Sequence, residues 1–214
     1  MLEVTRLSAG YGRARVLFEV NLVARAGEVV ALLGRNGAGK STLLKALMGL
    51  VERFSGEVRF AGQRIERLEP YEIARLGLGY VPEERRIFPG LSVAENLLVG
   101  RQPRRAEAPL WDDARLYALF PALGAMRSRR GARMSGGEQQ MLAIARTLAG
   151  NPRAILLDEP SEGLAPLVTA QVVAVVRELK RAGVTVLLAE QSPRFVERVA
   201  DRAYALEKGT LSER

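Results

Sequence analysis

The sequence predicts an α/β fold in which helices cover a mostly parallel central sheet. In the last third, short apolar strands alternate with helical stretches, at 154–157, 166–181, 184–189, 193–200 and 202–207. This alternation is typical of a parallel sheet with helices on its faces. Residues 84–150 interrupt it, because their pattern is mostly helical and rich in arginine. We therefore expect a helical subdomain inserted into one sheet domain.

The opening third predicts further strands. Residues 2–7 and 55–62 favour strands that we assign to an N-terminal antiparallel β part. The apolar run 28–33 predicts a buried parallel strand, and the leucine stripe within 39–50 predicts a helix. The 214 residues then form a single domain, with a core of residues 1–83 and 151–214 and a helical subdomain of residues 84–150.

Composition excludes several kinds of site. Neither cysteine nor histidine occurs, so a catalytic triad with histidine, a thiolate nucleophile and a His/Cys metal site are impossible. The net charge of +8 indicates either an anionic partner or simply an arginine-rich solvated surface. The longest charge-free run, Gly163 to Val176, is too short to span a bilayer, so we expect a soluble chain that reaches a membrane only as a peripheral subunit.

A glycine-rich segment between the strand 28–33 and the helix 39–50 carries the strongest chemical signal. Gly34 to Ser41 fits G-x-x-x-x-G-K-[ST], the phosphate-binding loop (P-loop) of an NTPase. Its backbone N–H groups cradle phosphates, Lys40 reaches the terminal phosphates, and the Ser41 hydroxyl can ligate Mg²⁺. The candidate nucleotide-binding residues here are Gly34, Arg35, Asn36, Gly37, Ala38, Gly39, Lys40, Ser41 and Thr42. The alternative is a glycine-rich turn before an ordinary helix.

Two carboxylates follow the apolar strand 154–157. Asp158 is expected to bind Mg²⁺, and Glu159 is expected to polarise the attacking water. Taken alone, a strand that ends in Asp-Glu could also introduce a helix cap. Together with the upstream P-loop it predicts phosphoryl chemistry.

A second candidate anion site lies at the start of another predicted helix. Ser135, Gly136 and Gly137 open the helix 135–149, where a serine and two glycines suit a phosphate oxygen. This could be only a capped helix. A second anion site so far along the chain suggests a nucleotide contacted from two sides.

These motifs, in this order and spacing, resemble the ATP-binding subunits of ABC transporters over almost the whole chain. The resemblance implies a P-loop NTPase that binds and hydrolyses ATP with Mg²⁺ and dimerises head to tail. Ser135, Gly136 and Gly137 then contact the ATP held by the partner's P-loop. The resemblance also places Tyr11 against adenine, although an exposed loop aromatic is the alternative.

Three departures from the usual family pattern point to one branch. Glu83 stands at the usual glutamine, as a ligand for Mg²⁺ or water, Gln191 stands at the usual switch histidine, and Ala165 replaces an aspartate. With the segments 81–89, 159–166 and 189–191 they resemble the ATP-binding subunits of branched-chain amino acid importers. Urea, amide and other amino-acid importers are close alternatives.

The resemblance implies several partners and a location. A second ATP-binding subunit, equal or different, and transmembrane permease subunits are expected, with a periplasmic solute-binding protein acting indirectly. The expected place is the cytoplasmic face of the inner membrane. A non-transport ABC ATPase that handles nucleic acid is less favoured, because neither a long coiled-coil insertion nor a duplicated cassette is present, and no nucleic-acid partner is expected.

The region from Glu83 to Val99 is expected to dock the permease. It places Arg85 and Arg86 beside Ile87 and Phe88, and apolar groups next to charge suit a partner surface. The alternative is that Ile87 and Phe88 pack into the helical subdomain.

Overall fold

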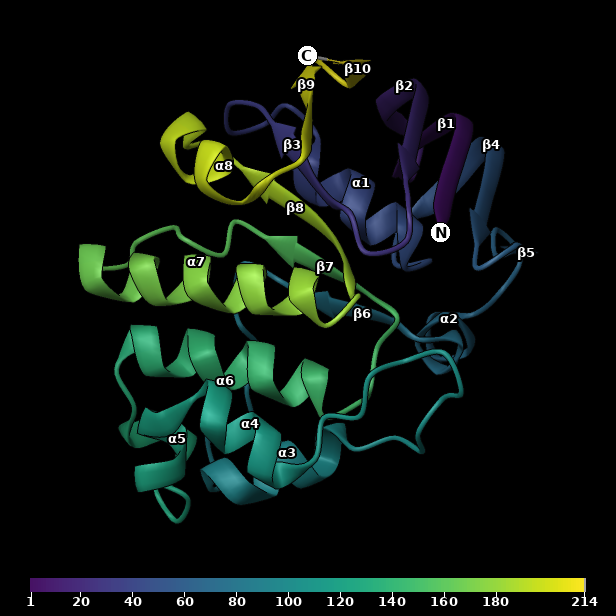
Figure 1. Ribbon diagram of the computed structural model, residues 1–214. Helices are drawn as coiled ribbons and strands as arrows, with labels where there is room; N and C mark the ends of the chain where they lie inside the picture. The colour runs from purple at the N-terminus through teal and green to yellow at the C-terminus, as the bar shows by residue number, and fades with distance from the viewer. Residues whose placement is uncertain (214) are drawn as a thin grey trace.

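Two sheets and a group of helices make up the structure, a computed structural model that describes residues 1–213 (Figure 1). The antiparallel sheet has the strand order β2 (Ala14–Ala24), β1 (Leu2–Tyr11), β4 (Glu52–Phe60), β5 (Gln63–Arg64). The second sheet has the order β10 (Thr210–Glu213), β9 (Arg202–Glu207), β3 (Val29–Leu33), β8 (Thr185–Glu190), β7 (Ala154–Asp158), β6 (Leu78–Val81). All its pairings are parallel except that of β9 with β10. The expected fold class is confirmed.

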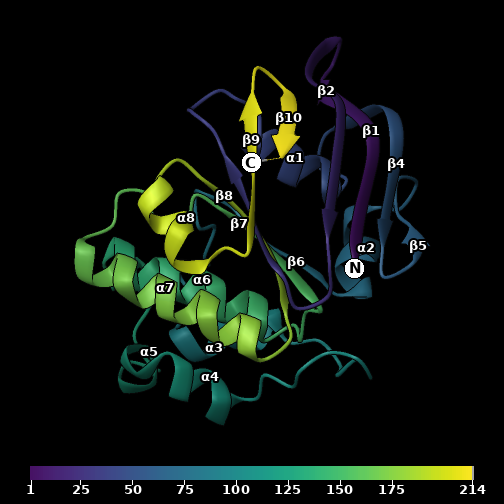
Figure 2. The same ribbon diagram turned by 45° about the horizontal axis from the view of Figure 1, so that its top comes forward.

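Alternate residues of the parallel strands feed two separate cores. In β3, for example, Val30 and Leu32 face the antiparallel sheet, whereas Val29 and Ala31 face the opposite way. Helix α1 (Lys40–Leu47) lies between the two sheets and buries Leu43 and other apolar residues there (Figure 2). This packing fixes the N-terminus of α1 at the carboxyl end of β3.

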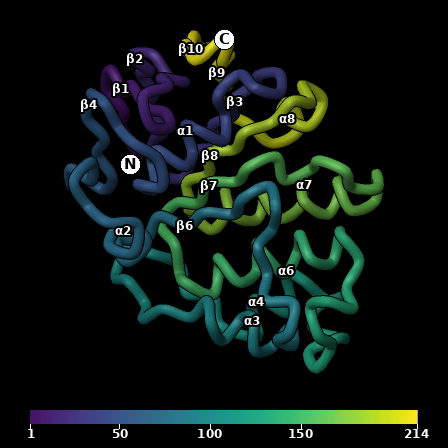
Figure 3. The backbone as a smooth tube through the Cα atoms, turned by 180° about the vertical axis from the view of Figure 1, so that it is seen from behind, coloured from purple at the N-terminus to yellow at the C-terminus, as the bar shows by residue number. Residues whose placement is uncertain are grey.

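Helices cover the other face of the parallel sheet. They include α6 (Gly136–Leu148), α7 (Pro166–Arg181) and α8 (Pro193–Val199), whose apolar residues share one core with the strands. The remaining helices are α2 (Pro70–Leu76), α3 (Val93–Gly100), α4 (Asp113–Leu119), α5 (Pro121–Ala125) and the 3₁₀ helix η1 (Gly131–Arg133). Viewed from behind, α3, α4 and α6 gather at the end away from β1, β2 and β4 (Figure 3). In residues 1–213 no helix is both long and apolar enough to cross a bilayer.

The expected strands and helices are present, with shifted ends. The helix expected over 39–50 ends at Leu47, because Gly49 takes a left-handed φ of 71° that a helix cannot continue. Strands β2, β5 and β10 and helices α2 and α5 were not predicted individually. In β2, polar and apolar residues do not alternate cleanly, since its pairing with β1 shifts register three times.

Candidate nucleotide-binding site

The P-loop connects β3 to α1 and lines a cavity of about 340 Å³. Its lining residues are Val16, Asn36, Gly37, Gly39, Lys40, Ser41, Thr42, Glu83 and Glu159. Gly39 has a φ of 109°, and a Cβ on Gly34 would lie 2.5 Å from the Leu206 carbonyl oxygen. The glycines are therefore required by the loop's path, and they leave its backbone open toward the cavity.

Lys40 is buried and engaged with its own loop and with Glu159. Its Nζ lies 2.9 Å from Glu159 Oε1 and donates to the carbonyl oxygens of Gly34 at 2.7 Å and Arg35 at 3.2 Å. Both side chains of the pair are almost fully buried, so each charge depends on the other for compensation. A phosphate that enters the cavity therefore competes with Glu159 for Lys40.

Asp158 ends β7 and accepts two hydroxyl hydrogen bonds. Ser41 donates to Oδ1 at 2.9 Å and Tyr80 donates to Oδ2 at 3.1 Å. Burial raises the pKa of the Asp158 carboxyl, while these two donors oppose that shift and the nearby Glu83 adds to it. Tyr80 was not a predicted site residue, because nothing in the β6 pattern shows that its hydroxyl faces β7.

Glu159 takes an unusual backbone conformation. Its φ is 44°, a left-handed value that strains a residue with a side chain, and its N–H donates to the Ala189 carbonyl at 3.0 Å. Gln191 follows β8 and donates from Nε2 to Glu159 Oε2 at 2.6 Å. The two oxygens of Glu159 are thus held by Lys40 and Gln191.

A buried carboxylate adjoins this pair. Glu190 Oε1 accepts the Ser161 N–H at 3.1 Å, and the Glu190 carbonyl oxygen accepts the Gly34 N–H at 3.3 Å. Burial raises the pKa of the Glu190 carboxyl. Glu190 was not a predicted site residue, since in sequence it appears as the end of an apolar strand. It connects the P-loop to the loop after Glu159.

The donors present fit Mg²⁺ bound together with phosphates. The Ser41 hydroxyl and the Asp158 carboxylate lie in contact, and Glu83 lines the same cavity. These are the oxygen ligands that Mg²⁺ prefers. Within residues 1–213 no cluster of three acidic residues could hold a metal by itself. A bound Mg²⁺ would therefore need phosphate oxygens and water as its remaining ligands.

Ser135 and its two glycines lie apart from this cavity. The Ser135 hydroxyl accepts the Glu138 N–H at 3.3 Å, and Glu138 accepts the Ser135 N–H at 2.7 Å, which forms a capping box at the start of α6. Ser135 and Gly136 are exposed, and none of the three residues lines the P-loop cavity. This placement leaves them accessible to a second molecule.

Tyr11 also lies outside the P-loop cavity. It ends β1, is 49% exposed, and lines a neighbouring hollow with residues 49–52. Val16 of β2 lines the P-loop cavity instead and packs near Gly39. Val16 was missed because only the path of β2 brings it to the P-loop.

Comparisons with known proteins identify the family. Residues 17–162, more than half of the chain, match the ABC transporter family. The chain is a member of that family.

Among its relatives are two branched-chain amino acid transport ATP-binding proteins. BraG of Pseudomonas aeruginosa is 42% identical over 99% of this chain and 91% of its own length. LivF of Archaeoglobus fulgidus, described as a probable branched-chain amino acid transport ATP-binding protein, is 36% identical over 99% of this chain and 88% of its own length. LptB of Escherichia coli K12, a lipopolysaccharide export ATP-binding protein, is 35% identical over 98% of this chain and 88% of its own length.

A solved ATP-binding subunit of an ABC transporter has the same fold. Its TM-score is 0.87 at 31% identity, with all of this chain and 89% of the other covered. The chain is thus an ATP-hydrolysing ABC transporter subunit that binds ATP. Cassettes of this family dimerise and pair with transmembrane domains.

The first prediction concerns Lys40. Lys40→Ala removes a charge-assisted contact to phosphate, worth about 1.5–3 kcal/mol, so ATP affinity should fall roughly tenfold to a hundredfold. Titration with a fluorescent ATP analogue measures this. Lys180→Ala, a lysine on α7 that pairs with Asp201, is the control and should bind normally. Unchanged affinity in Lys40→Ala would refute the proposed phosphate contact.

The second prediction concerns Glu159. Glu159→Gln keeps the shape of the side chain but cannot take a proton from water, so ATP binding should persist while hydrolysis falls by about 10²-fold or more. ATP should then trap a dimer, visible by size-exclusion chromatography. Glu197→Gln on the exposed face of α8 should hydrolyse ATP normally. Near-normal turnover of Glu159→Gln would move the catalytic role to another residue.

Proposed function

We propose that this chain powers the import of branched-chain amino acids, as one of two ATP-binding subunits under a membrane permease. The observation that carries this proposal is the 42% identity to BraG across nearly the full length of both chains. The departures at Glu83, Gln191 and Ala165 add support, because they resemble the same importer branch. The expected place is the cytoplasmic face of the inner membrane, with a periplasmic solute-binding protein acting through the permease.

In this proposal the P-loop amides and Lys40 hold the phosphates. Lys40 leaves Glu159 for the phosphates, which frees the Glu159 carboxylate to accept a proton from the attacking water. Gln191 already contacts Glu159 Oε2, so it can orient that carboxylate and donate to the γ-phosphate. Glu159 and Gln191 are accordingly the proposed catalytic residues.

Ser41, Asp158 and Glu83 are the proposed residues that hold Mg²⁺, directly or through water. When bound, Mg²⁺ neutralises phosphate charge and fixes the phosphate geometry. The Asp158 carboxylate offers both oxygens close to Ser41 and Tyr80, so its orientation is set before the ion arrives.

The proposed dimer completes the nucleotide site. We assign residues 84–150 to a helical subdomain that presents Ser135, Gly136 and Gly137 to the ATP on the partner's P-loop. The exposure of Ser135 and Gly136 at the N-terminus of α6 supports this role, because backbone N–H groups at a helix N-terminus attract phosphate. Tyr11, at the edge of the cassette, is the proposed stacking partner for adenine, and Val16 adds apolar surface nearer the P-loop.

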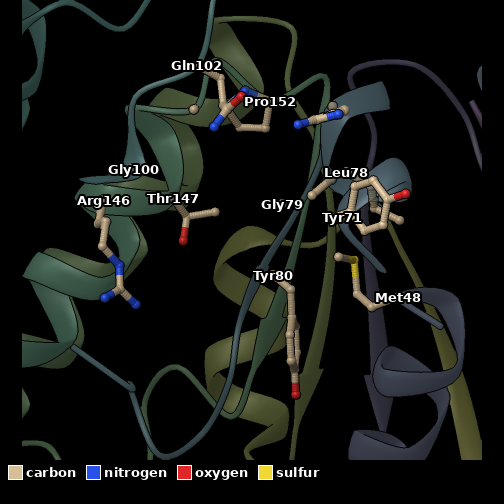
Figure 4. Close-up of a pocket in the computed structure, with 14 residues that line it drawn as sticks. Met48, Tyr71, Leu78, Gly79, Tyr80, Gly100, Gln102, Arg146, Thr147 and Pro152 are labelled. Atoms are coloured by element: carbon tan, nitrogen blue, oxygen red, sulfur yellow. The ribbon is translucent and has the colours of Figure 1, made fainter. Parts of the chain in front are cut away.

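A groove between the sheet and the helical subdomain is the proposed permease docking surface. It measures about 550 Å³ and separates α2 and β6 on one side from α6 on the other. In Figure 4, Tyr71, Leu78 and Met48 lie across the hollow from Arg146 and Thr147. Its apolar floor and cationic rim suit a short permease segment that carries acidic side chains.

The loop expected to dock the permease adjoins this groove. Ile87 is half-buried and packs against the core that the helices share with the parallel sheet, as the alternative to docking expects. Phe88 is 45% exposed, and the Arg146 guanidinium lies 5.0 Å from its ring centre. Asn96 of α3 is fully buried and bonds both the N–H and the carbonyl of Phe88, which holds the loop in place.

Lipopolysaccharide export is a second candidate, because the LptB relatives are 35–36% identical. The two candidates predict different phenotypes when this chain is deleted. We expect deletion of this chain to abolish uptake of radiolabelled leucine, while lipopolysaccharide still reaches the cell surface. Restored uptake on complementation with the natural chain, but not with Glu159→Gln, links the loss to ATP hydrolysis. Normal leucine uptake with defective lipopolysaccharide export would favour the second candidate, and urea uptake serves as a further comparison.

Docking is tested by crosslinking. The chain has no cysteine, so Phe88→Cys gives a single thiol. A short thiol–thiol crosslinker should join it to single cysteines placed in the cytoplasmic loops of a co-expressed permease. Val23→Cys, exposed on β2, is the control and should not react with those loops. Crosslinks from Val23→Cys alone would place the docking surface elsewhere.

A further inference from the structure

Tyr80 is shared by the groove and by the nucleotide site. Tyr80 lies on β6 and forms part of the wall of the 550 Å³ groove. Its hydroxyl donates to Asp158 Oδ2 at 3.1 Å. Figure 4 shows its ring below the hollow with the hydroxyl pointing away from it. One rigid side chain thus spans the distance between two sites.

The Tyr80 hydroxyl is a fixed donor. Burial and the Asp158 carboxylate both raise the pKa of Tyr80 above its ordinary value, so the phenol stays protonated at neutral pH. Asp158 is held from two sides, because Ser41 donates to its other oxygen at 2.9 Å. Ser41 belongs to α1 and Tyr80 to β6, so the carboxylate is held between two different elements of the fold.

We propose that Tyr80 is a positioning residue that orients Asp158 for Mg²⁺ and makes this orientation depend on what occupies the groove. The occupant is a cytoplasmic segment of the permease. The inference rests on the proposed function, since it takes Asp158 as a Mg²⁺ ligand and the groove as the docking surface. A phenylalanine would fill the same space, so the hydroxyl alone carries the effect.

The physical basis is that the tyrosine ring is stiff and that the strength of a hydrogen bond depends steeply on its geometry. Tyrosine has only two side-chain torsions, so pressure on the groove side of the ring moves the hydroxyl with it. A hydrogen bond weakens steeply as its angle and length depart from their optimum. A small shift of Tyr80 therefore releases Asp158 Oδ2, whereas Ser41 keeps Oδ1.

The first arm of the test removes only the hydroxyl. Binding of a fluorescent ADP analogue to the full chain is titrated against Mg²⁺, in wild type, Tyr80→Phe and the control Tyr117→Phe on α4. In Tyr80→Phe the half-saturating Mg²⁺ should rise about three- to tenfold, as one lost hydrogen bond predicts. Affinity without Mg²⁺ and the melting temperature should stay close to wild type. Tyr117→Phe should match wild type, and an unchanged Mg²⁺ requirement in Tyr80→Phe overturns the proposal.

The second arm fills the groove. Tyr71→Cys supplies a single thiol at the exposed groove rim, because the natural chain has no cysteine. A bulky maleimide on it should change the half-saturating Mg²⁺ at least threefold relative to the unlabelled variant. The same label on Tyr71→Cys/Tyr80→Phe should change it little, since the connecting hydroxyl is gone. Equal label effects with and without the hydroxyl, or no effect in either, contradict the link.

The outcomes separate this inference from the proposed function. Both arms use the isolated chain, so they do not depend on which solute is transported or on permease docking at the groove. If nucleotide binding by the wild type shows no Mg²⁺ dependence, the assigned metal ligands are wrong and the inference fails with them. If the wild type depends on Mg²⁺ and Tyr80→Phe matches it, only the role of Tyr80 is wrong.

Discussion

The buried ion pair between Lys40 and Glu159 is the constraint on which the rest of the site depends. Two opposite charges lie almost fully out of water, 2.9 Å apart, and each is compensated mainly by the other. Such a pair is costly to desolvate, and removing one partner leaves an uncompensated charge. A nucleotide phosphate can replace Glu159 as the partner of Lys40, so that the lysine charge stays compensated. In the proposed mechanism, nucleotide binding would therefore free Glu159 when its carboxylate has a water to act on.

The pair forms only because several parallel strands end at the same edge of the sheet. Leu33 of β3 pairs with Glu190 of β8, and Asp158 of β7 pairs with Ala189. The P-loop, the Asp-Glu turn and Gln191 consequently leave the sheet side by side, which is where open α/β sheets place ligands. The strained φ of 44° at Glu159 turns its side chain toward Lys40, away from the continuation of β7.

The sequence was sufficient to place residues whose position follows from local spacing, while their roles stay predictions. The P-loop, Asp158 and Glu159 could be found because a short motif after a strand fixes their backbone environment. Val16, Tyr80 and Glu190 could not, since each reaches the site through strand pairing between segments far apart in the chain. The expected fold class followed from the alternation of strands and helices. The exact ends of helices did not, as the left-handed Gly49 after α1 shows.

The exposed surfaces of the cassette follow from the same arrangement. The N-terminus of α6 presents Ser135 and Gly136 to solvent, and Leu167 at the start of α7 is 75% exposed. The P-loop cavity opens to the surface, although the Glu159 side chain that lines it is almost fully buried against Lys40. A partner molecule that brings its own Ser135 over the cavity would close it and supply positive N–H groups where charge develops. In the proposed mechanism, hydrolysis would wait for dimer closure, because only the closed site would combine a released Glu159 with a phosphate bound from both sides.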